Sequence, residues 1–281
     1  MSEVTAAGGI VLAVASLTDP GLKREVNEDS LFAESPVFLV ADGMGGYEAG
    51  DLASAAVVDA FRGLAGDGFA ELTGIRAALV AASEGVAQVA GATSRGAGST
   101  VTGAVIVEHE GVPHWLVFNV GDSRVYRHFG SELEQLTVDH SLGQELVDRG
   151  ELRREDMSAF AERNVITRAI GAADSTADSW LLPVVNGERL LICSDGLHSE
   201  LPDEGIRATL TMSGKPESAV ATLVQRAKAA GGRDNISVIV IDVISGGSLL
   251  VGEFTTGAAA VAGDLSDPEL DGTTIPVRAD R

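Results

Sequence analysis

The chain has 281 residues, enough for one large domain or two modest ones, and its 45% of hydrophobic residues exclude a disordered protein. Its formal net charge of −21 argues against nucleic acid or an anionic membrane as the main partner. One cysteine, Cys193, excludes an internal disulfide and suits the cytoplasm, and no stretch approaches the roughly 18 apolar residues of a membrane span.

Hydrophobic periodicity predicts both strands and helices in the first half of the chain. Apolar runs predict strands at 9–15 and 37–41. From Ala49 the apolar residues recur with a helical period, which predicts one helix up to about residue 64 and a second over about 71–92. A meander of short strands is predicted next, at 99–107, 114–120 and 123–128.

The second half begins with a polar, helix-prone segment at 140–163, broken at Gly150, which we expect to form a mobile surface flap. Apolar runs predict strands at 188–193 and 236–243, on either side of a helix at about 216–230. Runs of strands with paired helices favour antiparallel sheets covered by helices over a repeating βαβ fold. The predicted class is therefore α+β.

Acidic residues recur where predicted strands begin or end. Asp42 (in VADGMGG), Asp122 (in VGDSR) and Asp195 (in LLICSDG) each follow an apolar run, and Asp234 (in GGRDNISVI) precedes one. Each acid alone is more often a turn former than a ligand. If these strand ends converge, their carboxylates repel one another and demand cations or raised pKa values. Hard oxygen ligands with little histidine or cysteine nearby favour Mg²⁺ or Mn²⁺ over zinc.

Seven motifs in this order resemble the metal-dependent protein phosphatases of type 2C, the PPM family, in its bacterial form: REVNED, VADGMGG, STVTGAVI, NVGDSR, VITRAIG, CSDGL and GGRDNISV. The match extends over about residues 10–243. It implies a four-layer αββα sandwich of two antiparallel sheets flanked by helix pairs. Residues 1–245 would form the catalytic domain. Residues 246–281 show no sustained period and are predicted to form a flexible acidic tail.

The resemblance also implies roles for the acids. Asp42 would bridge two ions, Mn²⁺ or Mg²⁺, and the carbonyl of Gly43 would ligate one of them, with Asp195 and Asp234 completing that side. Glycines beside the acid would let the backbone carbonyl reach the metal.

On the other side of the implied centre, Glu28 would hold the second ion largely through water, with Asp29 behind it. Asp122 would help to hold a third, weaker ion. Arg24 is the candidate phosphate clamp, because a guanidinium can grip two phosphate oxygens at once.

Two positions depart from the family pattern. Met44 stands where animal relatives carry a histidine proposed as general acid, which leaves the proton donor to the leaving group open. Ser199 stands four residues after Asp195, where the family places the acid that accompanies Asp122, so a third ion should be weak or absent. Glu200 could replace that acid.

Three other residues near the motifs have plainer interpretations. His140 and His198 are expected to be surface or turn residues. Cys193 is expected to fill the end of a buried strand rather than act as a nucleophile, because a cysteine phosphatase needs an arginine six residues later and position 199 is serine.

The implied activity is hydrolysis of phosphoserine and phosphothreonine in proteins by a hydroxide that bridges the metals, without a covalent phosphoenzyme. The expected partners are phosphorylated proteins, including a bacterial Ser/Thr kinase and its substrates. The protein is expected to act in signal transduction in the cytoplasm and to be a monomer. Two alternatives remain open: a pseudophosphatase that only binds phosphoproteins, and a hydrolase of a small phosphate ester. The complete set Glu28, Asp42, Asp195 and Asp234 argues against the pseudophosphatase.

Overall fold

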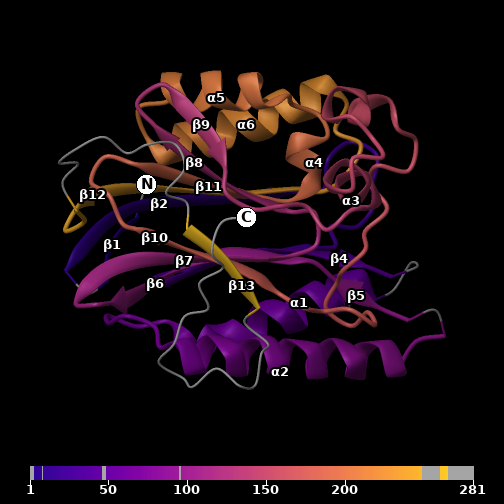
Figure 1. The fold of residues 1–281 in the computed structure, drawn as a ribbon, viewed down its shortest axis with the longest axis horizontal. Helices are drawn as coiled ribbons and strands as arrows, with labels where there is room; N and C mark the ends of the chain where they lie inside the picture. The colour runs from indigo at the N-terminus through magenta and orange to yellow at the C-terminus, as the bar shows by residue number, and fades with distance from the viewer. Residues whose placement is uncertain (1–2, 8, 46–48, 95, 249–259, 265–281) are drawn as a thin grey trace.

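Two antiparallel β-sheets lie face to face at the centre of the computed structural model, and a pair of helices covers the outer face of each sheet (Figure 1). The structure describes residues 3–7, 9–45, 49–94, 96–248 and 260–264. This four-layer arrangement confirms the predicted αββα sandwich. Among the described residues, none of the helices combines the length and apolar character needed to cross a membrane.

The first sheet has six strands, packed against α5 (Asp203–Met212) and α6 (Pro216–Ala230). Its strands run in the order β1 (Glu3–Ala7), β2 (Ile10–Asp19), β12 (Ile236–Ser245), β11 (Arg189–Cys193), β8 (Arg124–Phe129) and β9 (Glu132–Gln135). The second sheet packs against α1 (Gly50–Phe61), which continues into a 3₁₀ turn (Arg62–Leu64), and α2 (Leu72–Gly91). Its strands run in the order β13 (Ala260–Asp264), β10 (Asp178–Pro183), β7 (Val112–Val120), β6 (Val101–His109), β4 (Val37–Met44) and β3 (Asp29–Glu34), with β5 (Gly98–Ser99) paired to the end of β4.

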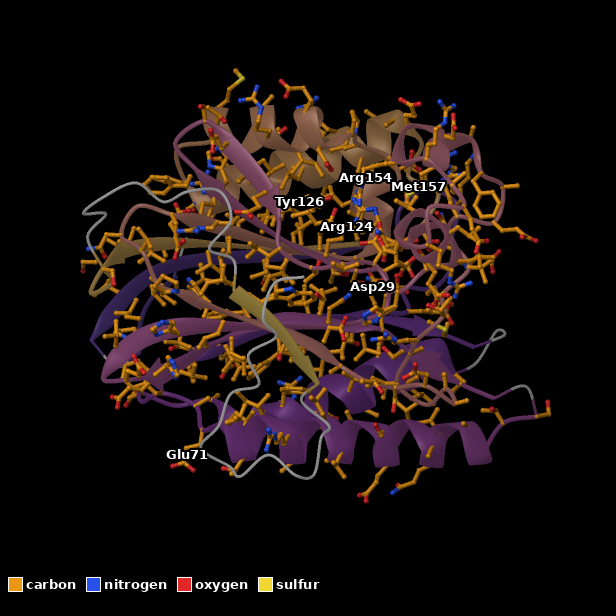
Figure 2. The ribbon with its side chains drawn as sticks, in the orientation of Figure 1. Asp29, Glu71, Arg124, Tyr126, Arg154 and Met157 are labelled. Atoms are coloured by element: carbon orange, nitrogen blue, oxygen red, sulfur yellow. The ribbon has the colours of Figure 1, made fainter. Side chains whose placement is uncertain are left out.

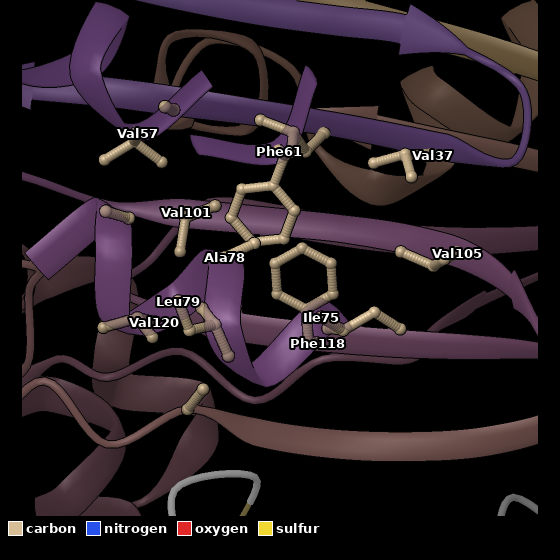
Figure 3. Close-up of a cluster of buried hydrophobic side chains, with 14 of the residues drawn as sticks. Val37, Val57, Phe61, Ile75, Ala78, Leu79, Val101, Val105, Phe118 and Val120 are labelled. Carbon is tan, nitrogen blue, oxygen red and sulfur yellow. The ribbon is translucent and has the colours of Figure 1, made fainter. Parts of the chain in front are cut away.

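Apolar side chains fill the space between the sheets and the space under each helix pair. Under α1 and α2, the ring of Phe61 stacks on that of Phe118 from β7, with ring centroids 5.4 Å apart and planes within 3° (Figure 3). Both residues are fully buried. Burying one such side chain stabilises a fold by about 1.5–3 kcal/mol, so these layers hold the sheets in place.

The predicted helices at 49–64, 71–92 and 216–230 are confirmed as α1 with its 3₁₀ turn, α2 and α6. Helix α5 and strands β9 and β10 were not predicted. The strands are short and depend on packing, whereas the buried Ile206, Thr209 and Leu210 of α5 recur at helical spacing and could have revealed the helix. The strand predicted at 37–41 runs on to Met44, so the expectation that it stops before Asp42 is wrong. The reason is that β5 pairs with Gly43 and Met44 and prolongs the ladder.

The polar segment at 140–163 contains α3 (Leu142–Asp148), capped by the Ser141 hydroxyl, and a 3₁₀ turn (Arg154–Ala159). Gly150 has a positive φ of 73°, which ends the helical stretch as expected.

Only two short parts of the predicted tail are described. The backbone N–H of Ser248 donates to the Val184 carbonyl at 2.7 Å, and β13 pairs with β10 in the second sheet. The rest of 246–281 lies outside the described residues, so a domain boundary at residue 245 stays a prediction.

Candidate metal centre

A cavity of about 690 Å³ collects every residue that the sequence placed at the metal and phosphate sites, apart from Asp29. It is lined by Lys23, Arg24, Glu25, Val26, Glu28, Asp42, Gly43, Met44, Gly45, Asp122, Ile166, Asp195 and Asp234. These residues come from segments far apart in the sequence. The fold therefore brings these acids to one cavity, as the resemblance implied.

The sheets explain this convergence. Asp42 lies in β4 directly opposite Asp29, the first residue of β3. Asp195 follows β11 as the first residue of the short helix α4 (Asp195–His198), and Asp234 precedes β12, the antiparallel neighbour of β11. Asp122 lies in the link between β7 and β8. The acids thus meet where strand ends of both sheets come together.

Close backbone packing fixes the loop around Asp42. A Cβ atom on Gly43 would overlap the Gly50 carbonyl oxygen and would lie 2.6 Å from the carbonyl oxygen of Glu28. The N–H of Gly43 instead donates to that Glu28 carbonyl at 3.1 Å. Only glycine fits here, because any side chain would occupy the space of the neighbouring backbone.

Two polar side chains that the sequence did not single out support the acids. The Asn235 Oδ1 accepts a hydrogen bond from the Glu28 N–H at 2.8 Å, and its Nδ2 donates to the carbonyls of Pro20 and Val26. The Thr100 hydroxyl accepts from the Asp42 N–H at 3.0 Å. Both lie within recognised motifs, GGRDNISV and STVTGAVI, but only the fold shows what they contact.

Asp29 lies behind the cavity rather than in its wall. Figure 2 shows it between the two sheets, and it accepts a hydrogen bond from the Ser194 hydroxyl at 2.8 Å. Ser194 Oγ in turn accepts from the N–H of Ser237 at 3.0 Å. Burial raises the pKa of Asp29 to about 7. Its position agrees with a supporting role behind the ligands, which stays a prediction.

The acids at the cavity repel one another and are poorly solvated. Burial, together with neighbouring acids, raises the pKa of Asp42 and of Asp122 well above the usual range of a carboxyl. Burial, with Asp234 nearby, raises the pKa of Asp195 to about 6, and Asp195 shares a hydrogen bond with Asp42. A divalent cation would relieve this repulsion and displace the retained protons.

The donor set fits a hard divalent cation. Asp122 Oδ1 and Asp195 Oδ1 are buried and make no hydrogen bond among the described residues, so each of these oxygens is available to coordinate a cation. All the candidate side-chain donors are carboxylates, the ligands that Mg²⁺ and Mn²⁺ prefer. In the part of the chain that the structure describes, however, no three acidic, histidine or cysteine side chains already surround one point. The acids share a cavity without closing on a common centre.

Arg24, the candidate phosphate clamp, lines this cavity but is paired. Its Nη2 lies 2.7 Å from Asp234 Oδ2, and its side chain is half exposed. The guanidinium therefore lies at the rim of the cavity and forms a salt bridge with Asp234, a predicted metal ligand. Its action on phosphate stays a prediction.

The expectation of surface or turn positions is wrong for both histidines near the motifs. His140 is buried; its Nδ1 accepts a hydrogen bond from the Gly121 N–H, and its Nε2 lies 3.2 Å from Asp178 Oδ2. His198 Nε2 donates to the Asp122 carbonyl at 2.9 Å, and burial lowers the pKa of His198 to about 3. Contacts with residues far away in the sequence hold both rings, so local polarity could not reveal them.

Ser199 is exposed and does not line the cavity. Glu200 is bound elsewhere, because Arg233 donates to its carboxylate from Nε at 2.9 Å and from the backbone N–H at 3.0 Å. The structure therefore does not place Glu200 as a substitute ligand beside Asp122.

Cys193 is buried, and burial raises its pKa to about 12, which agrees with a packing role.

The model of the Protein phosphatase 2C family matches residues 23–234. The chain belongs to this family. The serine/threonine protein phosphatase PstP of Mycobacterium tuberculosis (strain ATCC 25618 / H37Rv) is 35% identical over 249 residues, 87% of this chain but 46% of that protein. The chain thus spans about half of the length of PstP. The serine/threonine phosphatase stp of Listeria monocytogenes (serotype 4b) is 32% identical over 80% of this chain and 93% of its own length.

Solved structures of bacterial relatives share this fold. The Mycobacterium tuberculosis phosphatase PstP/Ppp superimposes with a TM-score of 0.77 at 31% identity, over 84% of this chain and 100% of that one. The PPM Ser-Thr phosphatase MsPP from Mycobacterium smegmatis, in complex with cacodylate, gives 0.73 at 35% identity, over 82% of this chain and 97% of that one. The PstP catalytic domain in complex with two manganese ions also gives 0.73, at 31% identity over 84% and 100%. These similarities confirm the resemblance seen in the motifs.

Proposed function

We propose that this chain is a metal-dependent phosphatase that removes phosphate from phosphoserine and phosphothreonine in proteins. The observation that carries the proposal is the convergence of five acids from separate segments on one cavity: Glu28, Asp42, Asp122, Asp195 and Asp234. Membership of the protein phosphatase 2C family and the names of the relatives support it.

Each acid has a proposed role. Asp42, the Gly43 carbonyl, Asp195 and Asp234 would hold one ion, and Glu28 would help Asp42 to hold the second. The ions would be Mn²⁺ or Mg²⁺, with a third at Asp122 weak or absent. When bound, two divalent ions supply a water-derived nucleophile at neutral pH and neutralise charge on the phosphoryl group.

The chain itself supplies positive charge at the rim of this cavity through Lys23 and Arg24. A phosphate dianion needs such cations in a protein whose net charge is −21. A cation on Asp234 would compete with Arg24 for that carboxylate and leave the guanidinium donors available to phosphate oxygens. Met44 lines the cavity and has no proton to give, so water is the proposed proton donor to the leaving group.

The proposed biological setting is bacterial signal transduction in which the chain opposes a Ser/Thr kinase and acts as a monomer. The single cysteine, Cys193, is free and buried, which fits our proposal of a cytoplasmic site of action. The segment at 140–163 is the proposed determinant of phosphopeptide preference, since the chain that follows it reaches the cavity wall at Ile166.

The test is a Mn²⁺-dependent dephosphorylation assay that compares a phosphothreonine peptide, a phosphorylated kinase and p-nitrophenyl phosphate. We expect turnover of all three that is lost in EDTA and in Asp42→Asn. Activity on p-nitrophenyl phosphate alone would favour a small phosphate ester as the substrate. Binding of phosphopeptide without turnover at any Mn²⁺ or Mg²⁺ concentration would indicate a pseudophosphatase, and full activity in EDTA would refute the mechanism.

A further inference from the structure

Two histidine side chains hydrogen-bond the backbone of the dipeptide Gly121–Asp122, one at each residue, and Asn119 Nδ2 donates to the carbonyl between them at 2.9 Å. We propose that His140 and His198 are positioning residues, which keep this peptide in the conformation that points the Asp122 carboxylate into the metal cavity. The proposal rests on the function proposed above, in which Asp122 is a metal ligand. Neither histidine lines the cavity, so neither is expected to touch metal or substrate.

His198 links two of the predicted ligands. It is the last residue of α4, and Asp195 is the first, so one turn of helix carries a predicted ligand at one end and this histidine at the other. Its Nε2 lies 2.9 Å from the Asp122 carbonyl oxygen. A carbonyl can only accept, so Nε2 carries the hydrogen. The bond fixes the backbone of Asp122 and leaves its carboxylate free.

His140 holds the preceding residue through both its backbone and its ring. Its N–H donates to the Gly121 carbonyl at 2.8 Å, and its Nδ1 accepts from the Gly121 N–H at 3.1 Å. Since Nδ1 accepts, the ring hydrogen lies on Nε2, where Asp178 Oδ2 accepts it at 3.2 Å. Arg168 binds the other oxygen of Asp178 at 3.1 Å, which orients the carboxylate toward the ring.

The Gly121–Asp122 peptide needs such support for two reasons. Gly121 has a φ of 115°, a conformation that only glycine adopts readily and that costs backbone entropy to fix. The buried Asp122 Oδ1 also makes no hydrogen bond among the described residues, so this oxygen contributes nothing to holding the loop. The Gly121 carbonyl also accepts from Asn119 Nδ2 at 2.9 Å, so the two histidines share with Asn119 the task of fixing the backbone from which Asp122 projects.

A purely structural role makes a different prediction, and His128 provides the matched control. It is also buried, and its Nε2 lies 2.9 Å from the Thr211 hydroxyl, on the face of the first sheet that α5 covers. It does not line the cavity. Replacing it with leucine removes one imidazole and one hydrogen bond, as at His198, and one hydrogen bond fewer than at His140, without touching the Gly121–Asp122 peptide.

The experiment compares His198→Leu, His198→Gln, His140→Leu, His140→Asn and His128→Leu in the full chain. The glutamine amide can reach the position of Nε2 and donate to Asp122, and the asparagine oxygen can replace Nδ1 as acceptor for Gly121. Hydrogen exchange of the Gly121 and Asp122 amides is measured in EDTA. Mn²⁺ binding that depends on Asp122 is measured by titration calorimetry, as the difference from Asp122→Asn.

We expect the two leucine variants at 140 and 198 to speed exchange at these amides by about tenfold or more, and His198→Gln and His140→Asn to restore most of the protection. Asp122-dependent Mn²⁺ binding should weaken by about tenfold, in the range found for groups that orient metal ligands. The remaining Mn²⁺ binding should change less than twofold. His128→Leu should alter neither quantity.

Equal exchange in His198→Leu, His140→Leu and His128→Leu, or no rescue by glutamine and asparagine, would overturn the inference. If Asp122→Asn removes no Mn²⁺ binding, the exchange data alone decide it, and the metal role of Asp122 is what fails. If the unaltered chain binds no Mn²⁺ at all, the proposed function fails, whatever the exchange data show about the two histidines.

Discussion

The two sides of the cavity are built differently. Around Asp42 close backbone packing fixes the strand end, because Gly43 packs directly on the carbonyls of Gly50 and Glu28, and the Thr100 hydroxyl adds one bond to the Asp42 N–H. Around Asp122 the peptide is held by side chains, the imidazoles of His140 and His198 and the amide of Asn119. The first side leaves no room for another residue type at the glycine. The second side also needs a glycine, since Gly121 has a φ of 115° and its Cβ would lie 2.5 Å from the Thr100 side chain, but its imidazole contacts should tolerate change at a graded cost.

The largest difference should appear when one acid is neutralised on each side. Asp234→Asn removes a charged ligand from the two proposed catalytic metal ions, and we expect a loss of at least about 100-fold in kcat/KM. Asp122→Asn affects only the weaker ion and should cost about tenfold or less. Steady-state kinetics at saturating Mn²⁺ measure both. Equal losses would show that the two sides do not differ in function.

The close backbone packing predicts the next largest effect. Gly43→Ala would push a Cβ into the Gly50 carbonyl, and we expect the free energy of unfolding to fall by about 3 kcal/mol. Gly91→Ala is the control, because its Cβ meets nothing within 4 Å at the exposed last residue of α2, where alanine should change the free energy of unfolding by less than about 1 kcal/mol. Urea unfolding in EDTA measures both variants. If Gly43→Ala leaves the free energy of unfolding unchanged, the end of β4 can move enough to accommodate a Cβ atom.

Stabilisation by Mn²⁺ should depend on pH. The folded-state pKa of Asp195 is about 6, above its usual value of 3.8, and that of Asp42 is also raised. In the metal-free protein the protonated carboxyl of Asp195 stabilises the fold at low pH, and that contribution is lost as the pH rises through about 6; the contribution of Asp42 has the same sign. Mn²⁺ must displace the same protons at pH 5.5 but fewer at pH 7.5.

We therefore expect the rise in Tm on adding Mn²⁺ to be several degrees larger at pH 7.5 than at pH 5.5. Differential scanning calorimetry with matched EDTA baselines at each pH measures it. The Asp42→Asn variant should show a smaller rise at both values. A rise independent of pH would argue that these carboxyls do not bind the ion.

The smallest expected effect is a gain on the weaker side. Ser199→Asp would add an acid where the family pattern has one, and Glu200 does not compete because Arg233 holds it. We expect Asp122-dependent Mn²⁺ binding to tighten by a few-fold, since affinity follows the number of charged ligands. Ser199→Asn is the uncharged control. If the two variants bind Mn²⁺ alike, position 199 does not face the site occupied by Asp122.

The sequence by itself determined the layers and the acids. Strand and helix periods depend on neighbouring residues, so α1, α2, α6 and most of the strands could be predicted. The resemblance carried by the motifs implied that Asp42, Asp195 and Asp234 serve one metal site, and all three line one cavity. Short strands such as β9 and β10 could not be predicted, because packing rather than local pattern decides them, whereas the helical period of α5 is present in the sequence.

Only the tertiary structure decided what each polar side chain contacts. It paired Arg24 with Asp234 across 210 positions, joined Glu200 to Arg233, and brought His198 to the Asp122 carbonyl across 76 positions. A hydrogen bond needs its two atoms within about 3 Å in a fixed direction. That condition depends on how whole sheets and helices are placed against one another, and no local pattern of residues encodes it.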